Sequence, residues 1–359
     1  MIRPGATVGI LGGGQLGRML ALAAAEYGLK AHVYTPEADS PAFDVAAERT
    51  CAPYEDEAAL IRFAKSCDVV TYEFENVPRR TAEIVGSLAP LFPDADALAT
   101  AQDRLSEKTF VAGLGIATAP FRAVADADDL RRALDVIGRP AVLKTRRFGY
   151  DGKGQAMIAP GADVDAIWSA MHHAPCILEG FVAFEREISV VAARTADGGF
   201  AAYDACANSH RQHILDVTRV PAGISATAEA EALGIARRIA EALGYVGVLT
   251  VEMFLVREGG AEQVVVNEIA PRVHNSGHWT IEGAATSQFA QHVRAICGWP
   301  LGSARRLGDV EMRNLIGDDT DEWAGLLADP EAHLHLYGKG EARPGRKMGH
   351  VTRVVPGAS

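Results

Sequence analysis

The chain has 359 residues, of which 48% are apolar and 23% are charged, a globular composition and a length that predict two or three packed domains. Asp and Glu number 46 against 35 Lys and Arg, and the resulting net charge of −11 argues against non-specific nucleic-acid binding. The 5 cysteines are widely spaced, form no CxxC pair and predict free thiols. With no leader-like segment and no apolar stretch long enough for a bilayer, we expect a cytoplasmic protein without membrane partners.

The first hundred residues alternate between strand and helix patterns. Short apolar runs at Val8–Leu11, Ala31–Tyr34 and Asp68–Tyr72 indicate strands, and Leu16–Tyr27 is rich in good helix formers. Strands separated by helices predict a parallel sheet covered by helices on both faces. We expect this α/β domain to end between residues 94 and 103.

The middle of the chain mixes strand pairs with helices, which predicts an α+β arrangement. Ala141–Thr145 and Cys176–Gly180 are typical of buried strands, and Ala226–Leu243 of an amphipathic helix. Two hairpins are expected, one joining Glu185–Arg194 to Phe200–Ala205 and one joining Gly247–Val256 to Gln263–Ile269 through Gly259-Gly260.

Glycines follow the first predicted strand. Gly12, Gly14 and Gly17 fit the pattern G-x-G-x-x-G before a helix, where backbone N–H groups can approach a phosphate. A dinucleotide site also needs an acid at the end of the second strand, but that strand runs into Pro36. The loop therefore disfavours a nicotinamide or flavin and leaves two alternatives: a tight turn without a ligand, or a site for a different phosphorylated or polar ligand.

A lysine and a glycine-rich loop follow the strand at residues 141–145. Lys144 ends an apolar run, and the segment GYDGKGQ at residues 149–155 carries Lys153 among three glycines. Backbone amides and a cation in such a loop can close over phosphates. The alternatives are a solvated lysine at a strand end and an ordinary hairpin turn at Asp151-Gly152.

Glu252 interrupts a nearly continuous apolar strand, and Glu268 follows the apolar run of the strand paired with it. Pairing around Gly259-Gly260 places Glu252 opposite Asn267 or Glu268. Two buried carboxylates at about 5 Å repel each other, and a divalent cation held by both, with Asn267 beside them, resolves the conflict. We therefore predict a Mg²⁺ site at these three residues; the alternative is that both acids pair with arginines or face water.

These features, in this order, resemble the ATP-grasp superfamily. Three longer segments narrow the resemblance: GGGQLGRM at residues 12–19, NEIAPRVHNSGHWT at 267–280 and RPGRKMGH at 343–350. They resemble the family of N5-carboxyaminoimidazole ribonucleotide synthases, and the likeness covers nearly the whole chain. The resemblance implies a pre-ATP-grasp α/β domain at 1–103, a two-lobed ATP-grasp domain at 104–296, a small C-terminal domain at 297–359, and a homodimer.

The family's reaction uses ATP and Mg²⁺, or Mn²⁺, to carboxylate 5-aminoimidazole ribonucleotide with bicarbonate through carboxyphosphate. The resemblance assigns ATP or its metal to Arg104, Lys108, Lys144, Gly149, Tyr150, Asp151, Gly152, Lys153, Gly154, Gln155, Glu179, Gly180, Phe181, Val182, Glu187, His210, Asn267 and Glu268. It assigns the ribonucleotide to Gln15, Leu16, Glu75, Asn275, Lys339, Arg346 and Lys347. Catalytic roles fall to Arg272 and His274, which handle bicarbonate, to Tyr150 and Asp151, which close over the reacting centre, and to Lys347.

Three other functions compete with this one. A formate-using glycinamide ribonucleotide transformylase shares the fold and the ATP site, but Gln15, the pair Tyr150-Asp151 and the segment HNSGH at residues 274–278 argue against it. A nicotinamide-dependent oxidoreductase explains the glycine loop alone. A regulatory ATP-binding module without catalysis is disfavoured by an intact acid pair and loop.

Overall fold

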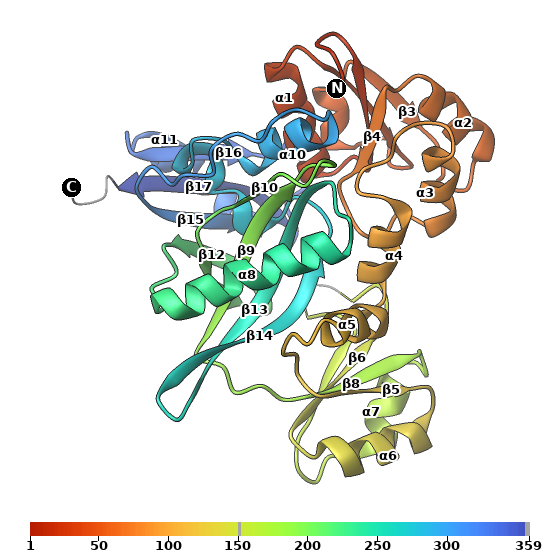
Figure 1. The fold of residues 1–359 in the computed structure, drawn as a ribbon, viewed down its shortest axis with the longest axis vertical. Helices are drawn as coiled ribbons and strands as arrows, with labels where there is room; N and C mark the ends of the chain where they lie inside the picture. The colour runs from red at the N-terminus through yellow and green to blue at the C-terminus, as the bar shows by residue number, and fades with distance from the viewer. Residues whose placement is uncertain (150–151, 356–359) are drawn as a thin grey trace.

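The computed structural model describes residues 1–149 and 152–355, so the catalytic and ATP-binding roles predicted for Tyr150 and Asp151 lie outside the described residues. Three sheets make up the fold (Figure 1): a parallel sheet near the N-terminus, a small antiparallel sheet, and a large sheet that includes the C-terminal strands. Within the described residues, none of the helices is both long and apolar enough to cross a membrane.

The N-terminal sheet has the order β3-β2-β1-β4, and its strands are parallel. Its strands are β1 (Thr7–Leu11), β2 (Lys30–Thr35), β3 (Glu48–Cys51) and β4 (Val69–Tyr72). Around them lie α1 (Gln15–Glu26), η1 (Pro41–Asp44), α2 (Glu57–Lys65), α3 (Arg79–Gly86) and α4 (Ala95–Gln102). The three predicted strands and the predicted helix are confirmed. Asp56 caps α2 by accepting from Ala59 N at 2.9 Å.

The small sheet has the order β5-β8-β6-β7 and follows the linking helix α5 (Arg104–Gly113). Its strands are β5 (Phe121–Val124), β6 (Ala141–Thr145), β7 (Gln155–Ile158) and β8 (Cys176–Gly180), and α6 (Ala127–Ile137) and α7 (Val164–Ala170) complete this unit. Leu130 and Leu134 of α6 and Trp168 of α7 are buried in a core with the strands. This packing holds the Lys144 end of β6 in place.

The large sheet has the order β14-β13-β9-β11-β12-β15-β17-β16, with β10 paired to β9. Its strands are β9 (Arg186–Arg194), β10 (Phe200–Ala202), β11 (Cys206–Arg211), β12 (Ile214–Val220), β13 (Gly247–Glu258), β14 (Ala261–Ala270), β15 (Asp309–Ile316), β16 (Ala332–Leu336) and β17 (Lys347–Val355). Helix α8 (Ala226–Ala242) crosses β9 and β13 (Figure 1), burying its apolar stripe. Shorter segments are η2 (Asn275–Gly277), α9 (Thr280–Gly283), α10 (Gln288–Ile296), η3 (Gly317–Glu322) and α11 (Trp323–Leu327).

Both predicted hairpins are confirmed, since β10 pairs with β9 and β14 with β13. Gly259 and Gly260 both have positive φ, 58° and 85°, which the tight turn between Glu258 and Ala261 requires. The strands β15, β16 and β17 extend the large sheet through the pairing of β15 with β12. The domain limits expected from the sequence remain predictions.

One buried histidine joins the N-terminal sheet to the large sheet. His292 of α10 bonds Thr71 Oγ1 on β4 through Nε2 at 2.8 Å and accepts from Val248 N on β13 through Nδ1 at 3.0 Å. Apolar residues of α1, α10 and β15 merge into a single core beside it. The two units therefore pack directly against each other.

Candidate active site

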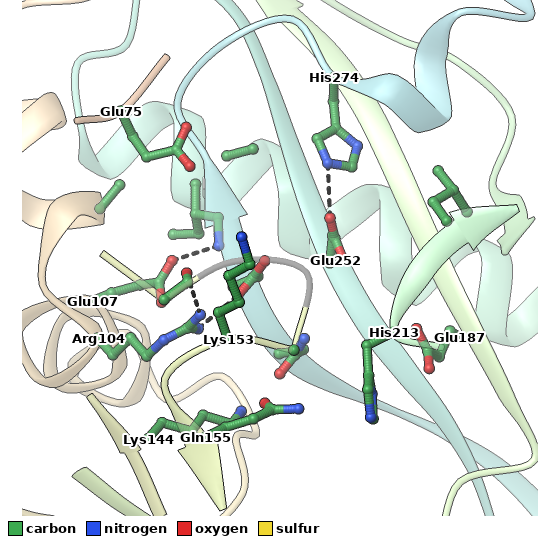
Figure 2. A pocket seen from close by; sticks show the side chains of 18 of the residues that line it. Glu75, Arg104, Glu107, Lys144, Lys153, Gln155, Glu187, His213, Glu252 and His274 are labelled. Atoms are coloured by element: carbon green, nitrogen blue, oxygen red, sulfur yellow. Dashed lines mark hydrogen bonds and ion pairs between the residues drawn. The ribbon is translucent and has the colours of Figure 1, made fainter. Parts of the chain in front are cut away.

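A cleft of about 800 Å³ lies where the three sheets meet. Figure 2 shows acidic and basic side chains of α5, β6, β9, β13 and the segment after β14 converging on it. Most of the predicted site residues line this cleft: Gln15, Leu16, Glu75, Arg104, Lys144, Gly149, Gly152, Lys153, Gln155, Glu179, Gly180, Phe181, Val182, Glu187, His210, Glu252, Asn267, Glu268, Arg272, His274, Asn275 and Lys347.

The glycine loop holds a carboxylate of the chain itself. Gly14 N donates to Glu73 Oε1, and Gly17 N donates to Glu73 Oε2 at 2.7 Å. A Cβ atom added at Gly12, which has a φ of 109°, would lie 2.3 Å from Glu73 Cγ. The loop therefore pairs its amides with an internal acid, so these donors are not directed at a dinucleotide phosphate.

The two acids of the predicted metal site face each other across the hairpin as expected. Glu252 lies opposite Glu268, and a β-bulge at this point inserts Asn267 as the extra residue. Glu268 pairs with Arg104 at 2.6 Å, and Glu252 Oε1 pairs with His274 Nε2 at 2.9 Å (Figure 2). Each acid thus has a basic partner, which is close to the alternative that the sequence left open.

The donor set nevertheless fits a hard cation. Asn267 Oδ1 is buried and has no hydrogen-bond partner in the structure, and a buried carbonyl oxygen without a donor is a suitable ligand for Mg²⁺. Among residues 1–149 and 152–355, no group of three or more His, Cys, Asp or Glu side chains is placed to hold a metal ion. Two carboxylates and an amide need further oxygens, and these would come from phosphates.

The charge of Glu268 is strongly favoured by its surroundings. Burial alone would raise the pKa of this carboxyl, but attraction and a hydrogen bond from Arg104 outweigh burial and lower the pKa to about 2. Glu268 is therefore a carboxylate at neutral pH. Arg104 also donates to Gly149 O at 3.1 Å, which links the acid pair to the glycine-rich loop after β6.

In the wall of the cleft, Glu179 lies between two lysines. Lys144 Nζ is 3.0 Å and Lys108 Nζ 3.5 Å from Glu179 Oε2. Burial raises the pKa of Glu179, but the two lysines outweigh it and hold the pKa below its ordinary value. Lys108 is 2% exposed, donates to Val266 O at 3.2 Å and is not among the residues that line the cleft.

A second acid–base pair lies on β9 and β11. His210 Nδ1 and Glu187 Oε2 are 2.8 Å apart. Burial lowers the pKa of His210, but the hydrogen bond and the charge of Glu187 outweigh burial and raise it. The two predicted ATP contacts are thus partners of each other in the structure.

Several of the predicted substrate residues have partners within the chain. Arg272 Nε donates to Glu75, so the predicted bicarbonate residue and a predicted ribonucleotide residue form an ion pair. Asn275 exchanges amide hydrogen bonds of 2.9 and 2.8 Å with Asn314. Lys339 Nζ donates to Lys347 O at 2.7 Å, and Arg346 donates to Glu341 O at 2.9 Å. Like Lys108, three predicted residues are not among those that line the cleft: Gly154, Lys339 and Arg346.

Several cleft residues were not predicted from the sequence. Glu107 of α5 accepts from Ile269 N, and burial, reinforced by Glu268, raises its pKa to about 8. Phe184 and Phe254 stack with ring centroids 4.6 Å apart. Phe254 could have been found, since it lies two residues from Glu252 on one strand and strand side chains alternate between faces. Glu107 gives no comparable signal, because its position depends on how α5 docks against β14.

The fold and the cleft define an ATP-grasp protein. A family model described as an ATP-grasp domain matches residues 109–289, a ribonucleotide synthetase preATP-grasp domain matches residues 5–102, and a phosphoribosylaminoimidazole carboxylase C-terminal domain matches residues 311–357. The chain belongs to the N5-carboxyaminoimidazole ribonucleotide synthase family. It is 48% identical over 357 residues to the N5-carboxyaminoimidazole ribonucleotide synthase of Brucella melitensis biotype 1, covering 99% of this chain and 98% of the relative.

Solved structures agree with this assignment. A crystal structure of an ADP complex of N5-carboxyaminoimidazole ribonucleotide synthetase superposes with a TM-score of 0.95 at 41% identity, covering 99% of this chain and 94% of that chain. The N5-carboxyaminoimidazole synthase of Aspergillus clavatus, in complex with ADP and 5-aminoimidazole ribonucleotide, has a TM-score of 0.90 at 32% identity, covering 99% of this chain and 95% of that chain.

Proposed function

We propose that this chain is a ligase that carboxylates 5-aminoimidazole ribonucleotide with bicarbonate and ATP to N5-carboxyaminoimidazole ribonucleotide, giving ADP and phosphate, in purine biosynthesis. The observation that carries the proposal is the single cleft in which the acid pair Glu252–Glu268, the cations of Arg104 and Lys144, and the carboxylate-binding Arg272 meet. The family's solved complexes with ADP and with 5-aminoimidazole ribonucleotide support this proposal.

ATP binds, in this proposal, between the small sheet and the large sheet. Lys144, Lys153 and Arg104 lie where cations can neutralise charge on the migrating phosphoryl group. Phosphoryl transfer needs such positioned charge more than a protein nucleophile. Glu252, Glu268 and Asn267 would hold Mg²⁺, which supplies charge neutralisation at the phosphates when bound.

Bicarbonate and the ribonucleotide bind, in this proposal, near Arg272 and Lys347. A guanidinium matches a planar anion with paired hydrogen bonds, so Arg272 exchanges Glu75 for bicarbonate as the substrates enter. His274, beside Glu252, donates to a bicarbonate oxygen or moves the proton that the amine loses. Carboxyphosphate is short-lived in water, so the reaction requires a site that excludes water.

The choice of acid is tested by ADP release. Wild-type protein is incubated with ATP, Mg²⁺ and 5-aminoimidazole ribonucleotide, and bicarbonate is compared with formate. We expect ADP release with bicarbonate but not with formate. Arg272→Ala should lose the bicarbonate-dependent ADP release, and the exposed control Arg122→Ala should keep it. Equal turnover with formate would favour the transformylase reaction, and unchanged bicarbonate turnover in Arg272→Ala would remove Arg272 from the site.

Two further properties belong to the proposal. The five cysteines are free in the structure, which supports a reducing compartment, and we place the protein in the cytoplasm. The homodimer that the family resemblance implies is likewise proposed, and size-exclusion chromatography with light scattering measures it. The partners are small molecules: ATP, bicarbonate and the ribonucleotide.

A further inference from the structure

A row of buried polar side chains crosses the large sheet beneath His274. Thr218 on β12 lies opposite Asn208 on β11, and Ser189 on β9 lies opposite Glu252 on β13. Asn208 Nδ2 joins the two halves of the row by donating to Ser189 Oγ at 2.9 Å. Thr218 and Ser189 are fully buried, and Asn208 is 8% exposed. None of the three polar residues Thr218, Asn208 and Ser189 lines the cleft itself.

The hydrogen bonds of this row run in one direction. Thr218 Oγ1 donates to Asn208 Oδ1 at 3.0 Å, which leaves the Asn208 NH₂ group to donate onward to Ser189. Ser189 Oγ then donates to Ser276 Oγ at 2.8 Å. Ser276 Oγ accepts from Ser189 and keeps its own proton to donate, and His274 Nδ1 lies 2.9 Å from it.

We infer that the chain Thr218–Asn208–Ser189–Ser276 holds His274 in the tautomer with an unprotonated Nδ1 and a protonated Nε2. Two hydrogen bonds outside this row agree with this assignment of the His274 protons. Ser276 N donates to His274 Nδ1 at 3.3 Å, and Nε2 faces the Glu252 Oε1 acceptor at 2.9 Å. The Nε2–H group is therefore the one presented to the cleft.

The backbone of His274 is held by other contacts, so the hydrogen-bonded row Thr218–Asn208–Ser189–Ser276 acts on the imidazole ring. Gln288, fully buried, accepts from His274 N at 2.9 Å and donates to His274 O at 2.7 Å. The close approach requires Gly277, because a Cβ atom there would lie 2.6 Å from Gln288 Oε1. With the backbone fixed, the remaining freedom of His274 is the orientation and tautomer of its imidazole, which are set by Ser276.

The consequence for the reaction rests on the proposed function of His274 at the reacting acid. A histidine that donates through Nε2 serves as a hydrogen-bond donor to a bicarbonate oxygen, whereas the other tautomer presents a lone pair. Ser189 and Asn208 are thus positioning residues that act through Ser276. Loss of a group that orients a catalytic imidazole typically lowers activity by about tenfold or more.

Two variants test the inference in the full-length protein. Ser189→Ala breaks the chain, and Asn208→Asp keeps its shape but replaces the donating amide with an acceptor, which opposes the direction of every later bond. The ring nitrogens of His274 are observed by NMR after labelling with ¹⁵N-histidine, with His274→Gln identifying the signals. We expect wild type to show an unprotonated Nδ1, and both variants to shift toward a protonated Nδ1.

Activity is measured in parallel as bicarbonate-dependent ADP release. Both variants should lower kcat about tenfold and leave the KM for ATP unchanged. The matched control is Thr250→Val, which removes a buried hydroxyl without a hydrogen-bond partner from β13, next to β9, and should change neither the His274 signals nor kcat. Thermal unfolding of each variant verifies folding.

Unchanged His274 nitrogen shifts in both chain variants, or the same loss of kcat in Thr250→Val, would overturn the inference. The inference and the proposed function fail in different ways. If the wild-type protein shows the predicted His274 tautomer but no bicarbonate-dependent ADP release, the inference about His274 stands and the proposed function is overturned.

Discussion

At the residue scale, the chemistry depends on charges that the structure pairs before any substrate binds. Arg104 holds Glu268, His274 holds Glu252, and Arg272 holds Glu75. An unpaired charge in such a buried cleft would be costly, so the two arginines give Glu268 and Glu75 their counter-charges, and the Nε2–H group of His274 gives Glu252 a hydrogen-bond donor. We expect substrate binding to exchange these partners for substrate groups.

Glu268→Gln tests the acid pair. Removing this charge should weaken the binding of Mg²⁺ and leave the charge on the migrating phosphoryl group less well compensated. We therefore expect turnover to fall by at least about a hundredfold while the fold stays intact. The measurement is ADP release at saturating Mg²⁺ together with thermal unfolding. Glu258→Gln, exposed at the end of the partner strand β13, is the control. Near-normal turnover of Glu268→Gln would contradict the metal assignment.

The acid pair was predictable because its signal is local. Glu252 and Glu268 interrupt apolar strands, and Gly259-Gly260 sets the register that brings them together. The partner Arg104 was predicted only as an ATP contact, since its distance from Glu268 depends on the docking of α5 against β14. Glu73 was missed for the same reason, because 56 residues separate it from Gly17 and no spacing rule connects them.

At the element scale, regular segments with strong patterns were predicted best. The hairpin β13–β14, the helix α8 and the strand β8 follow the expected residues closely. A small C-terminal domain was expected, but its strands were not predicted, nor was the pairing of β15 with β12 that continues the large sheet. Pairing between strands 90 residues apart leaves no trace in local periodicity.

The start of β17 carries the next prediction, because Lys347 lines the cleft there. We propose that Lys347 binds the 5′-phosphate of the ribonucleotide. Lys347→Ala should raise the KM for the ribonucleotide about tenfold and leave the KM for ATP nearly unchanged, since a charge-assisted bond to phosphate is lost. Steady-state kinetics with each substrate varied provide the measurement. Arg343→Ala, exposed in the preceding turn, is the control, and equal effects on both KM values would contradict the site.

At the scale of the whole molecule, three buried histidines tie stability to pH. Burial lowers the pKa of His292 to about 3, from an ordinary value of 6.5. Burial, reinforced by repulsion from neighbouring basic groups, also holds the pKa values of His278 and His350 well below 6.5. The unfolded chain therefore binds protons between pH 6.5 and 3 that the folded chain does not, so the free energy of unfolding falls as the pH is lowered through this range.

His292→Gln isolates one of these contributions. The variant should be less stable at pH 7, because the hydrogen bond from Val248 N and the one to Thr71 Oγ1 are disturbed. Between pH 6 and 4 the free energy of unfolding falls as the pH is lowered. We expect this slope to be smaller in the variant than in wild type by up to about 1.4 kcal/mol per pH unit. Urea unfolding at a series of pH values measures both effects, with the exposed His333→Gln as control. Equal slopes in wild type and His292→Gln would contradict this account.

The central claim is that three packed units bring ATP, bicarbonate and the ribonucleotide into one cleft, so that the acid activated by ATP is bicarbonate. The most direct test follows the carbon atom. Wild-type protein is mixed with ATP, Mg²⁺, 5-aminoimidazole ribonucleotide and ¹³C-bicarbonate, and ¹³C NMR is recorded while ADP is measured. The account predicts a labelled carbamate carbon that grows in equal amount with ADP and is absent without ATP. ADP formation with no labelled carbamate would contradict it.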